Sequence, residues 1–274
     1  MFTIFTIPKP FNDPHINIIQ RNAIQSWKTL IGYEIFLMGD DEGVKEIAEE
    51  LGVKHIPQIK KNEYGTPLLD SAFNLAYKNS TKDYLMYINS DIILTPDFLK
   101  IESYIPKEEF LIVGQRWDVD IDTLIDYNKE SWPSEVKNKI KENGKIHHPC
   151  GSDYFIFRKG SFLNIPSFAV GRVGWDNWMI YKAVNSEMLS IDASKFYKVI
   201  HQNHDYKHLT NKKEDIYTNT EAQKNKELAV GRYHLEYTEY NLTLKGLKKK
   251  IIDHRRIKNG IIRFINFFLT KINK

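Results

Sequence analysis

Short apolar runs and longer periodic segments alternate along the first part of the chain. Runs rich in branched and aromatic residues, typical of buried strands, occur at residues 2–7, 34–38, 53–56, 84–88 and 110–114. Between most of these runs, apolar residues recur every three or four positions, as they do on one face of a helix. This order predicts right-handed crossovers and an α/β fold with a mostly parallel central sheet flanked by helices.

Polar residues and prolines indicate where the predicted helices begin. Asp13 and Pro14 predict the start of the first helix, because an aspartate side chain caps free amides and proline fits the first turn. Gly32 is expected to end this helix. Three further helix starts are expected, at the pairs Asp40-Asp41, Thr66-Pro67 and Thr95-Pro96.

The second half of the chain has a less regular pattern. Residues 115–143 are polar and rich in acids, and no element is assigned to them. Strands are expected at 154–157 and 196–200, with a helix that starts in the segment 171–178 and reaches about Val184. The last of these strands leads directly into a histidine-rich segment.

Composition places the chain among globular proteins. With 274 residues, of which 42% are apolar, it can bury a large core. Its single cysteine, Cys150, excludes an internal disulfide and suits a reducing compartment. There is no basic leader and no run of about 18 apolar residues, so neither a signal peptide nor a spanning helix is expected. We therefore expect a cytoplasmic protein.

Positive charge is concentrated at the C-terminus. Residues 245–274 contain ten of the 39 basic residues and one of the 35 acidic residues, which leaves about −5 on the rest of the chain. From Ile257 onwards, apolar residues recur at helical spacing, which predicts a basic amphipathic helical tail over 241–274. Such a tail suits the inner face of an anionic membrane, and it equally suits a terminal helix packed on the domain.

Three polar clusters have positions suited to chemistry: Asn89-Ser90-Asp91 after a strand, Asp176 at a helix start, and residues 201–208 after the last strand. Ligands of open α/β sheets bind at the carboxyl ends of the strands, so Asp91 is expected to face a crevice. Asp91 and His204 offer the oxygen and imidazole donors that hold a divalent cation against a diphosphate. Asp176 suits a general base.

Each of these clusters also has an ordinary structural interpretation. Asn-Ser-Asp is typical of a turn, and an aspartate at a helix start is often only a cap. Asp153, which opens a predicted strand, can bind sugar hydroxyls or can simply be a charge at a strand edge.

The histidines allow other metal sites as well. The spacing of 201, 204 and 208 is conceivable for zinc, and His147, His148 and Cys150 could form part of a soft-metal site. A dinucleotide-binding protein and a P-loop enzyme lack support, because neither a G-x-G-x-x-G nor a G-x-x-x-x-G-K-[ST] motif is present. The absence of a G-x-S-x-G motif likewise disfavours a serine hydrolase.

The chain resembles the GT-A glycosyltransferases, in particular a bacterial branch of the family 2-like group. The resemblance covers residues 1 to about 235 and rests on the segments 5–11, 89–91, 151–155, 171–178 and 201–206. It implies one GT-A domain over 1–240, with a nucleotide-sugar-binding half (about 1–115) and an acceptor half (116–240).

The resemblance also implies roles for individual residues. Asp91 matches the last acid of a D-x-D-type motif that holds Mn²⁺ or Mg²⁺, and His204 or His201 the distal ligand. Asp176 matches the base. The remaining implied site residues are Pro8, Asp40 and Asn89 around the nucleotide, and Asp153 and Trp175 around the acceptor. The chain departs from the family's D-x-D-type motif at Asn89, where an amide replaces the usual first aspartate. One anionic ligand is therefore missing.

The expected function is transfer of a sugar from a nucleotide-diphospho-sugar to a glycan or lipid-linked acceptor, with inversion, in surface polysaccharide biosynthesis. One alternative is a sugar-phosphate nucleotidylyltransferase, which is disfavoured because Pro8-Lys9-Pro10 stands where a glycine-rich loop is expected. Another is a non-enzymatic protein that binds through its basic tail. Nucleic acid is not expected as a partner.

Overall fold

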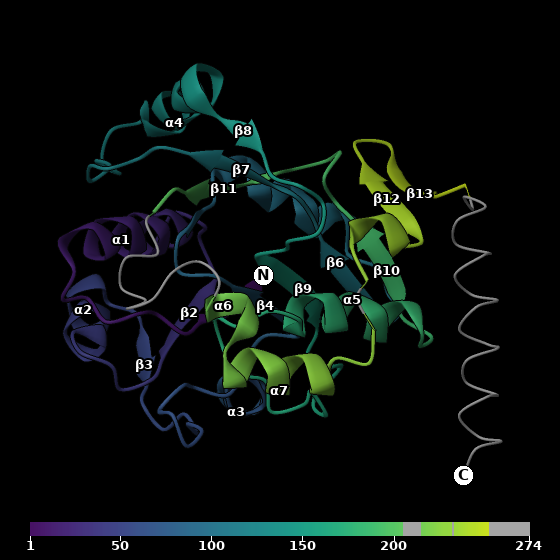
Figure 1. The fold of residues 1–274 in the computed structure, drawn as a ribbon. Helices are drawn as coiled ribbons and strands as arrows, with labels where there is room; N and C mark the ends of the chain where they lie inside the picture. Colours follow the sequence, from purple (N-terminus) through teal and green to yellow (C-terminus); the bar gives the residue numbers. More distant parts are fainter. Residues whose placement is uncertain (205–214, 232, 252–274) are drawn as a thin grey trace, which may run out of the picture.

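The computed structural model has a central mixed sheet with helices on both faces (Figure 1). It describes residues 1–204, 215–231 and 233–251, and over this part of the chain the sheet has nine strands. In spatial order they are β13 (Gly246–Lys249), β12 (Tyr240–Thr243), β10 (Leu189–Asp192), β6 (Phe110–Val113), β9 (Tyr154–Arg158), β4 (Tyr84–Ile88), β1 (Phe2–Thr6), β2 (Glu34–Met38) and β3 (Lys54–Ile56).

The predicted parallel arrangement is confirmed for the first four strands. β4, β1, β2 and β3 are parallel neighbours, and β10 is parallel to both β6 and β12. β9 lies antiparallel between β4 and β6, although it comes much later in the chain. The two predicted halves of the domain therefore share one sheet.

Alternation of side chains along the strands divides the core between the two faces of this sheet. On β1, Phe2 and Ile4 join the cluster that packs with α1 (Pro14–Lys28), α2 (Val44–Leu51) and the 3₁₀ helix η1 (Pro96–Tyr104). Phe5 points the other way and packs with α3 (Leu69–Asn79) and α5 (Trp175–Val184). Because successive strand residues face opposite sides, a continuous apolar run is what a sheet covered on both faces requires.

A smaller sheet and the helix that packs on it use part of the segment 115–143, to which the sequence assigned no element. The order of this sheet is β5 (Ile92–Ile93), β11 (Val199–Gln202), β7 (Arg116–Val119) and β8 (Lys145–Ile146), and α4 (Trp132–Asn143) packs on it. Figure 1 shows this sheet and α4 above the central sheet, with α3 and α7 (Thr220–Leu228) below. The remaining elements are α6 (Asp215–Thr218) and the 3₁₀ helix η2 (Leu235–Tyr237).

The strand predicted at 196–200 begins later than expected. Phe196 and Tyr197 both donate backbone hydrogen bonds to the carbonyl of Ala193, so they form a turn, and β11 starts only at Val199. The apolar run continued through the turn because the rings of Phe196 and Tyr197 pack on the core.

Two of the four predicted helix starts are confirmed, since α1 begins at Pro14 after Asp13 and η1 begins at Pro96 after Thr95. Asp13 caps α1, because its Oδ1 accepts from the amides of His15 (2.8 Å) and Ile16 (2.9 Å). The other two helices begin later than predicted, α2 after Gly43 and α3 after Leu68, and neither these two nor η1 has a side-chain cap. Gly43 supplies a φ of 81°, a left-handed conformation that favours glycine.

The C-terminal region departs from a helical tail beginning at 241. β12 and β13 form an antiparallel hairpin that extends the central sheet to Lys249. The apolar pattern that predicted a helix starts at residue 257, which lies outside the described residues, so that helix and its membrane contact stay predictions. No helix in the described part of the chain is both long and apolar enough to cross a bilayer.

Candidate active site

Two loops meet at the carboxyl edge of the parallel strands. Pro8 and Lys9 follow β1, and residues 89–91 follow its neighbour β4. Gln20 of α1 joins them: it accepts from the Lys9 amide (2.7 Å) and from Ser90 Oγ (2.8 Å), and its Nε2 donates to the Lys9 carbonyl (2.9 Å). Burial lowers the pKa of Lys9, while the nearby charge of Asp91 opposes this shift. The side chain of Lys9 thus lies close to Asp91.

Asp91 lies at the junction of the two sheets. The turn that contains it connects β4 of the central sheet to β5 of the smaller one. His201 on β11 is paired with Ile92 on β5, and this register brings the histidine next to Asp91. The structure therefore unites residues that are more than a hundred positions apart.

Asp91, His201 and His204 form a compact cluster of donor atoms. Asp91 Oδ2 lies 3.1 Å from His204 Nε2 and 3.6 Å from His201 Nε2. One ligand atom from each residue lies within 4.8 Å of the others, and no other such group of histidine, cysteine and acidic residues occurs among the described residues. The predicted grouping of these three residues is what the structure shows.

A buried glutamine fixes the backbone beneath this cluster. Gln202 is fully buried, and its Nε2 donates to the carbonyls of Ile19 (2.8 Å) and Asp91 (3.1 Å). Its Oε1 accepts from Asn22 Nδ2 (2.9 Å). Helix α1, strand β11 and the Asp91 turn are therefore held by a single side chain.

The electrostatics of the cluster favour a charged carboxylate. Burial alone would raise the pKa of Asp91, but the neighbouring imidazoles, His201 foremost, hold it well below its usual range. Burial would lower the pKa of His201, yet the charge of Asp91 and contacts with Asp118 raise it to about 9. The negative charge of Asp91 and the positive charge of a protonated His201 therefore stabilise each other.

The donor set fits a divalent cation. Asp91 Oδ1 is buried and has no hydrogen-bond partner, so the carboxylate has unused ligand capacity. Ligands that share an ion at about 2.0–2.2 Å lie roughly 3–4 Å apart, which is the range of the measured carboxylate-to-imidazole distances.

The other predicted metal sites find no such support. His201 lies on a strand, so a helical 201/204/208 arrangement is wrong at its first member, and His208 is outside the described residues. His147 binds Asp118 through Nδ1 (2.8 Å), and Cys150 is exposed.

A second network adjoins the cluster and joins two predicted site residues, Asn89 and Asp153, to two that the sequence did not indicate, Arg116 and Asp118. Arg116 on β7 donates from Nε to Asp118 Oδ1 (2.7 Å) and from Nη1 to Asp153 Oδ1 (2.6 Å). Asn89 Nδ2 also donates to Asp153 Oδ1 (2.9 Å). Asp153 Oδ2 is buried and has no hydrogen-bond partner. Because residues i and i+2 of a strand share a face, the alternation Arg116-Trp117-Asp118 was the signal that could have revealed this network.

Asp176 lies beside Asp153, in the first turn of α5. The residue before the helix, Gly174, has a φ of 105°, and no side chain caps this helix. Burial raises the pKa of Asp176 to about 6, and the charge of Asp153 adds to the rise, while backbone amides of Asn177 and Ser152 oppose it. Capping does not account for Asp176, and a carboxylate with a pKa near neutrality suits proton transfer.

Two other predicted site residues have different surroundings. Trp175 is buried, and its ring packs against Tyr87 and Phe155 with centroids 5.1 and 5.0 Å apart. The position of Trp175 is therefore explained by its packing in the core beneath Asp176. Asp40 follows β2 at the same edge of the sheet, is largely exposed, and pairs with Lys61 (2.6 Å).

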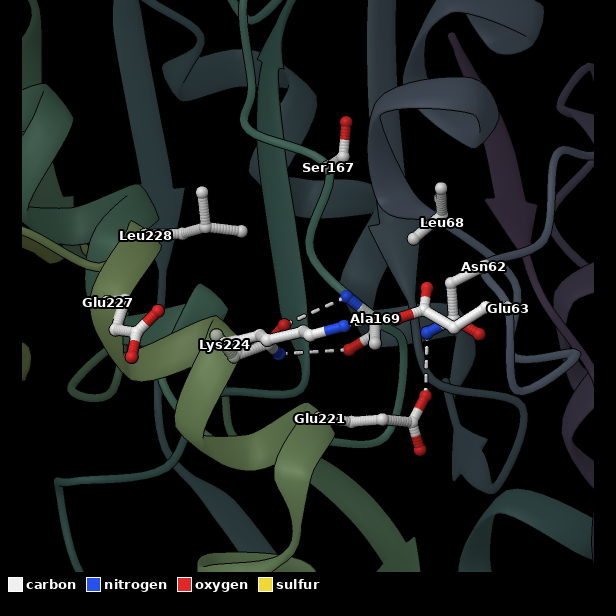
Figure 2. A pocket seen from close by; sticks show the side chains of 10 residues that line it. Asn62, Glu63, Leu68, Ser167, Ala169, Glu221, Lys224, Glu227 and Leu228 are labelled. Carbon is white, nitrogen blue, oxygen red and sulfur yellow. Dashed lines mark hydrogen bonds and ion pairs between the residues drawn. The ribbon is translucent and has the colours of Figure 1, made fainter.

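A separate cavity of about 460 Å³ lies between α7 and the loops around residues 62–68 and 167–169. Figure 2 shows Asn62 and Glu221 facing each other across its wall, with Asn62 donating to Glu221 (2.7 Å). Arg172 also binds Glu221 (2.6 Å), and Asn225 bonds both backbone groups of Ala169. These contacts hold the segment that leads into α5, and hence Asp176, against α7.

Comparisons with known proteins give a family match and several similar solved structures. A family model described as "Glycosyl transferase family 2" matches residues 19–165. Among solved structures, glucosyl-3-phosphoglycerate synthase from Mycobacterium tuberculosis is 10% identical, with 83% of this chain and 78% of that one covered and a TM-score of 0.49. TarS 1–349 from S. aureus is 12% identical, with coverage of 73% and 60% and a TM-score of 0.45. No curated protein sequence matches.

Proposed function

Because the chain belongs to glycosyl transferase family 2, and is thus a transferase enzyme with the GT-A fold, we propose that it moves a sugar from a nucleoside-diphospho-sugar to an acceptor hydroxyl. The observation that carries this proposal is the cluster of Asp91, His201 and His204 at the carboxyl edge of the sheet. This is the edge at which open α/β sheets bind nucleotides.

The donor diphosphate is assigned to the space next to this cluster. A divalent cation, when bound by Asp91, His201 and His204, neutralises negative charge on the leaving diphosphate. Lys9 adds a second positive charge beside Asp91. Pro8, Asp40 and Asn89, on neighbouring strand ends, are proposed to surround the nucleotide.

The acceptor hydroxyl is assigned to the side of Asp153 and Asp176. Asp176 accepts the hydroxyl proton as the oxygen attacks the anomeric carbon, and attack from the face opposite the diphosphate inverts the configuration. Its pKa of about 6 keeps it ionised at neutral pH but basic enough to take a proton. The free Oδ2 of Asp153 is placed to accept a hydrogen bond from a sugar hydroxyl.

Family membership decides between the functional alternatives. A nucleotidylyltransferase and a non-enzymatic binding protein are both disfavoured, since the match is to a transferase family. A glycan or lipid-linked acceptor in surface polysaccharide biosynthesis is the proposed biological setting. Candidate glycans and glycolipids, extracted from cells, can be tested as acceptors of radiolabelled sugar. If none of them accepts sugar from any donor, that setting is contradicted.

Two matched variants test the proposed roles. Asp91→Ala is expected to lower metal-dependent nucleotide release at least about 100-fold, because the cation loses its only carboxylate. Asp176→Asn is expected to lower transfer by about 10²–10⁴-fold while Mn²⁺-dependent nucleotide binding is kept. Asp97→Asn, which removes a surface charge paired with Lys100 and Lys137, is the control and should match the parent enzyme.

The measurement is release of nucleoside diphosphate from a panel of sugar donors with Mn²⁺ or Mg²⁺, with and without acceptor. Unchanged release in Asp91→Ala would remove the metal role. Full transfer by Asp176→Asn would remove the base.

A further inference from the structure

The proposed cation site is unusually rich in nitrogen. Its three clustered donors are one carboxylate and two imidazoles, and Asn89, whose amide nitrogen donates to Asp153, offers only a neutral amide oxygen where a second carboxylate is usual. Mg²⁺ is a hard cation that selects oxygen ligands, whereas imidazole suits borderline transition metals. The composition of the site therefore bears on which metal it takes.

Asp118 stands behind one of the imidazoles. Its Oδ1 lies 3.2 Å from His201 Nδ1, on the opposite side of the ring from Nε2, which faces Asp91. This approach is a close electrostatic contact rather than a well-aligned hydrogen bond, because His201 Nδ1 lacks a partner by hydrogen-bond geometry. A negative charge at this place favours the proton on Nδ1 and leaves Nε2 as the free metal donor.

The position of Asp118 is itself fixed. Arg116 Nε binds its Oδ1 at 2.7 Å, and His147 Nδ1 binds its Oδ2 at 2.8 Å. β7, which carries both Arg116 and Asp118, is hydrogen-bonded in parallel to β11, with Asp118 directly beside His201. Arg116, His147 and the pairing of β7 with β11 thus all restrain Asp118, as the role of an orienting group requires.

We propose that Asp118 is a positioning residue that presents His201 Nε2 to the cation, and that the resulting two-imidazole site binds Mn²⁺, Co²⁺ or Zn²⁺ in preference to Mg²⁺. The inference rests on the proposed function, because it assigns the metal to the same three residues. It adds the identity of the preferred metal and a residue that acts without touching it.

The test is metal binding by the full chain without nucleotide. Titration calorimetry is expected to give an affinity for Mn²⁺ at least about 10-fold higher than for Mg²⁺, with Co²⁺ tighter than Mn²⁺. Bound Co²⁺ should show visible absorption bands that His201→Ala abolishes. Asp118→Asn should weaken Co²⁺ binding by about 10–100-fold and shift those bands. Asp97→Asn is the matched surface control and should behave as the parent.

A second variant guards against misfolding. His201→Asp replaces a nitrogen donor by oxygen, so the ratio of Mn²⁺ to Mg²⁺ affinity should fall toward one, and thermal melting checks that each variant is folded. Equal affinities for Mg²⁺ and Mn²⁺ in the parent would overturn the proposal. So would a folded Asp118→Asn variant with an unchanged Co²⁺ spectrum and affinity.

The outcome separates this inference from the proposed function. Sugar transfer at full rate with Mg²⁺, and no metal preference, would refute the inference and leave the transferase intact. Co²⁺ bound by these residues, without turnover of any sugar donor, would refute the transferase role and leave the metal assignment intact.

Discussion

Asp176 illustrates how one buried side chain connects chemistry to stability. Its burial and the nearby charge of Asp153 disfavour the ionised form, so its pKa rises from 3.8 to about 6. A base with this pKa is ionised at neutral pH, but the folded protein bears the cost of holding that charge. Activity and stability should therefore respond to pH in opposite directions over the same range.

The rate of sugar transfer should rise with pH through about 6. Below this value Asp176 is protonated and cannot accept the hydroxyl proton, so the rate should fall about tenfold per pH unit, and above it the rate should level off. Initial rates at saturating donor and Mn²⁺ between pH 5 and 8 measure this profile. The residual activity of Asp176→Asn should lack the limb, and a persisting limb would assign it to another group.

The raised pKa of Asp176 also determines how the free energy of unfolding changes with pH. A folded-state pKa above the unfolded one gives stability that is fully present below about pH 3.8 and is lost as the pH rises through about 6. Asp176→Asn removes this loss, so at pH 7 the variant should be more stable by ~1–3 kcal/mol, with no gain at pH 3.5. Urea unfolding at both pH values checks this, and a destabilised variant at pH 7 would contradict it.

At the scale of secondary structure, the sequence predicted an element correctly where neighbouring residues alone carried its pattern. The apolar runs of β1, β2 and β4 and the cap at Asp13 are local patterns, and the structure confirms them. β7 is short and alternates polar with apolar residues, so it was overlooked within an acid-rich segment.

The residues of the candidate site likewise fall into those that the sequence indicated and those that only the structure revealed. Asp91 and the two histidines carry their chemistry in their residue types, and the sequence brought them out. Arg116 and Asp118 became visible only through contacts with residues 153, 147 and 201, which no local pattern reports. Asp40-Asp41 failed as a cap because a nearby lysine, Lys61, binds both carboxylates.

Gln202 is where the packing of elements determines the geometry of the site. Gln202→Met keeps the length of the side chain but leaves the buried carbonyl groups of Ile19 and Asp91 without this donor. The expected cost is about 1–3 kcal/mol of unfolding free energy, together with weaker Mn²⁺ binding as the Asp91 turn loosens. Gln223→Met on the exposed face of α7 is the matched control, with an expected change within about 0.5 kcal/mol.

Urea unfolding and Mn²⁺ titration of both glutamine variants provide the measurement. Equal stability of Gln202→Met and the parent would show that this hydrogen-bond network does not hold α1, β11 and the Asp91 turn together.

At the scale of the molecule, the site lies where the two sheets join. Asp91 belongs to the connection from β4 to β5, His201 comes from the smaller sheet, and Asp176 comes from the helix that packs on the central one. The nucleotide, the cation and the acceptor are thus assigned to surfaces from different layers. Binding of a nucleotide with its metal should tie these layers together and stabilise the whole fold.

Thermal unfolding with nucleoside diphosphates, in the presence and absence of Mn²⁺, tests this account most directly. At a concentration about 100 times its dissociation constant, the correct nucleotide with Mn²⁺ should add about 2.7 kcal/mol, a rise in melting temperature of about 5–10 °C. The rise should be lost without Mn²⁺ and in Asp91→Ala. No shift with any nucleoside diphosphate, or an equal shift in Asp91→Ala, would contradict the central claim that residue 91 holds a cation against a nucleotide diphosphate.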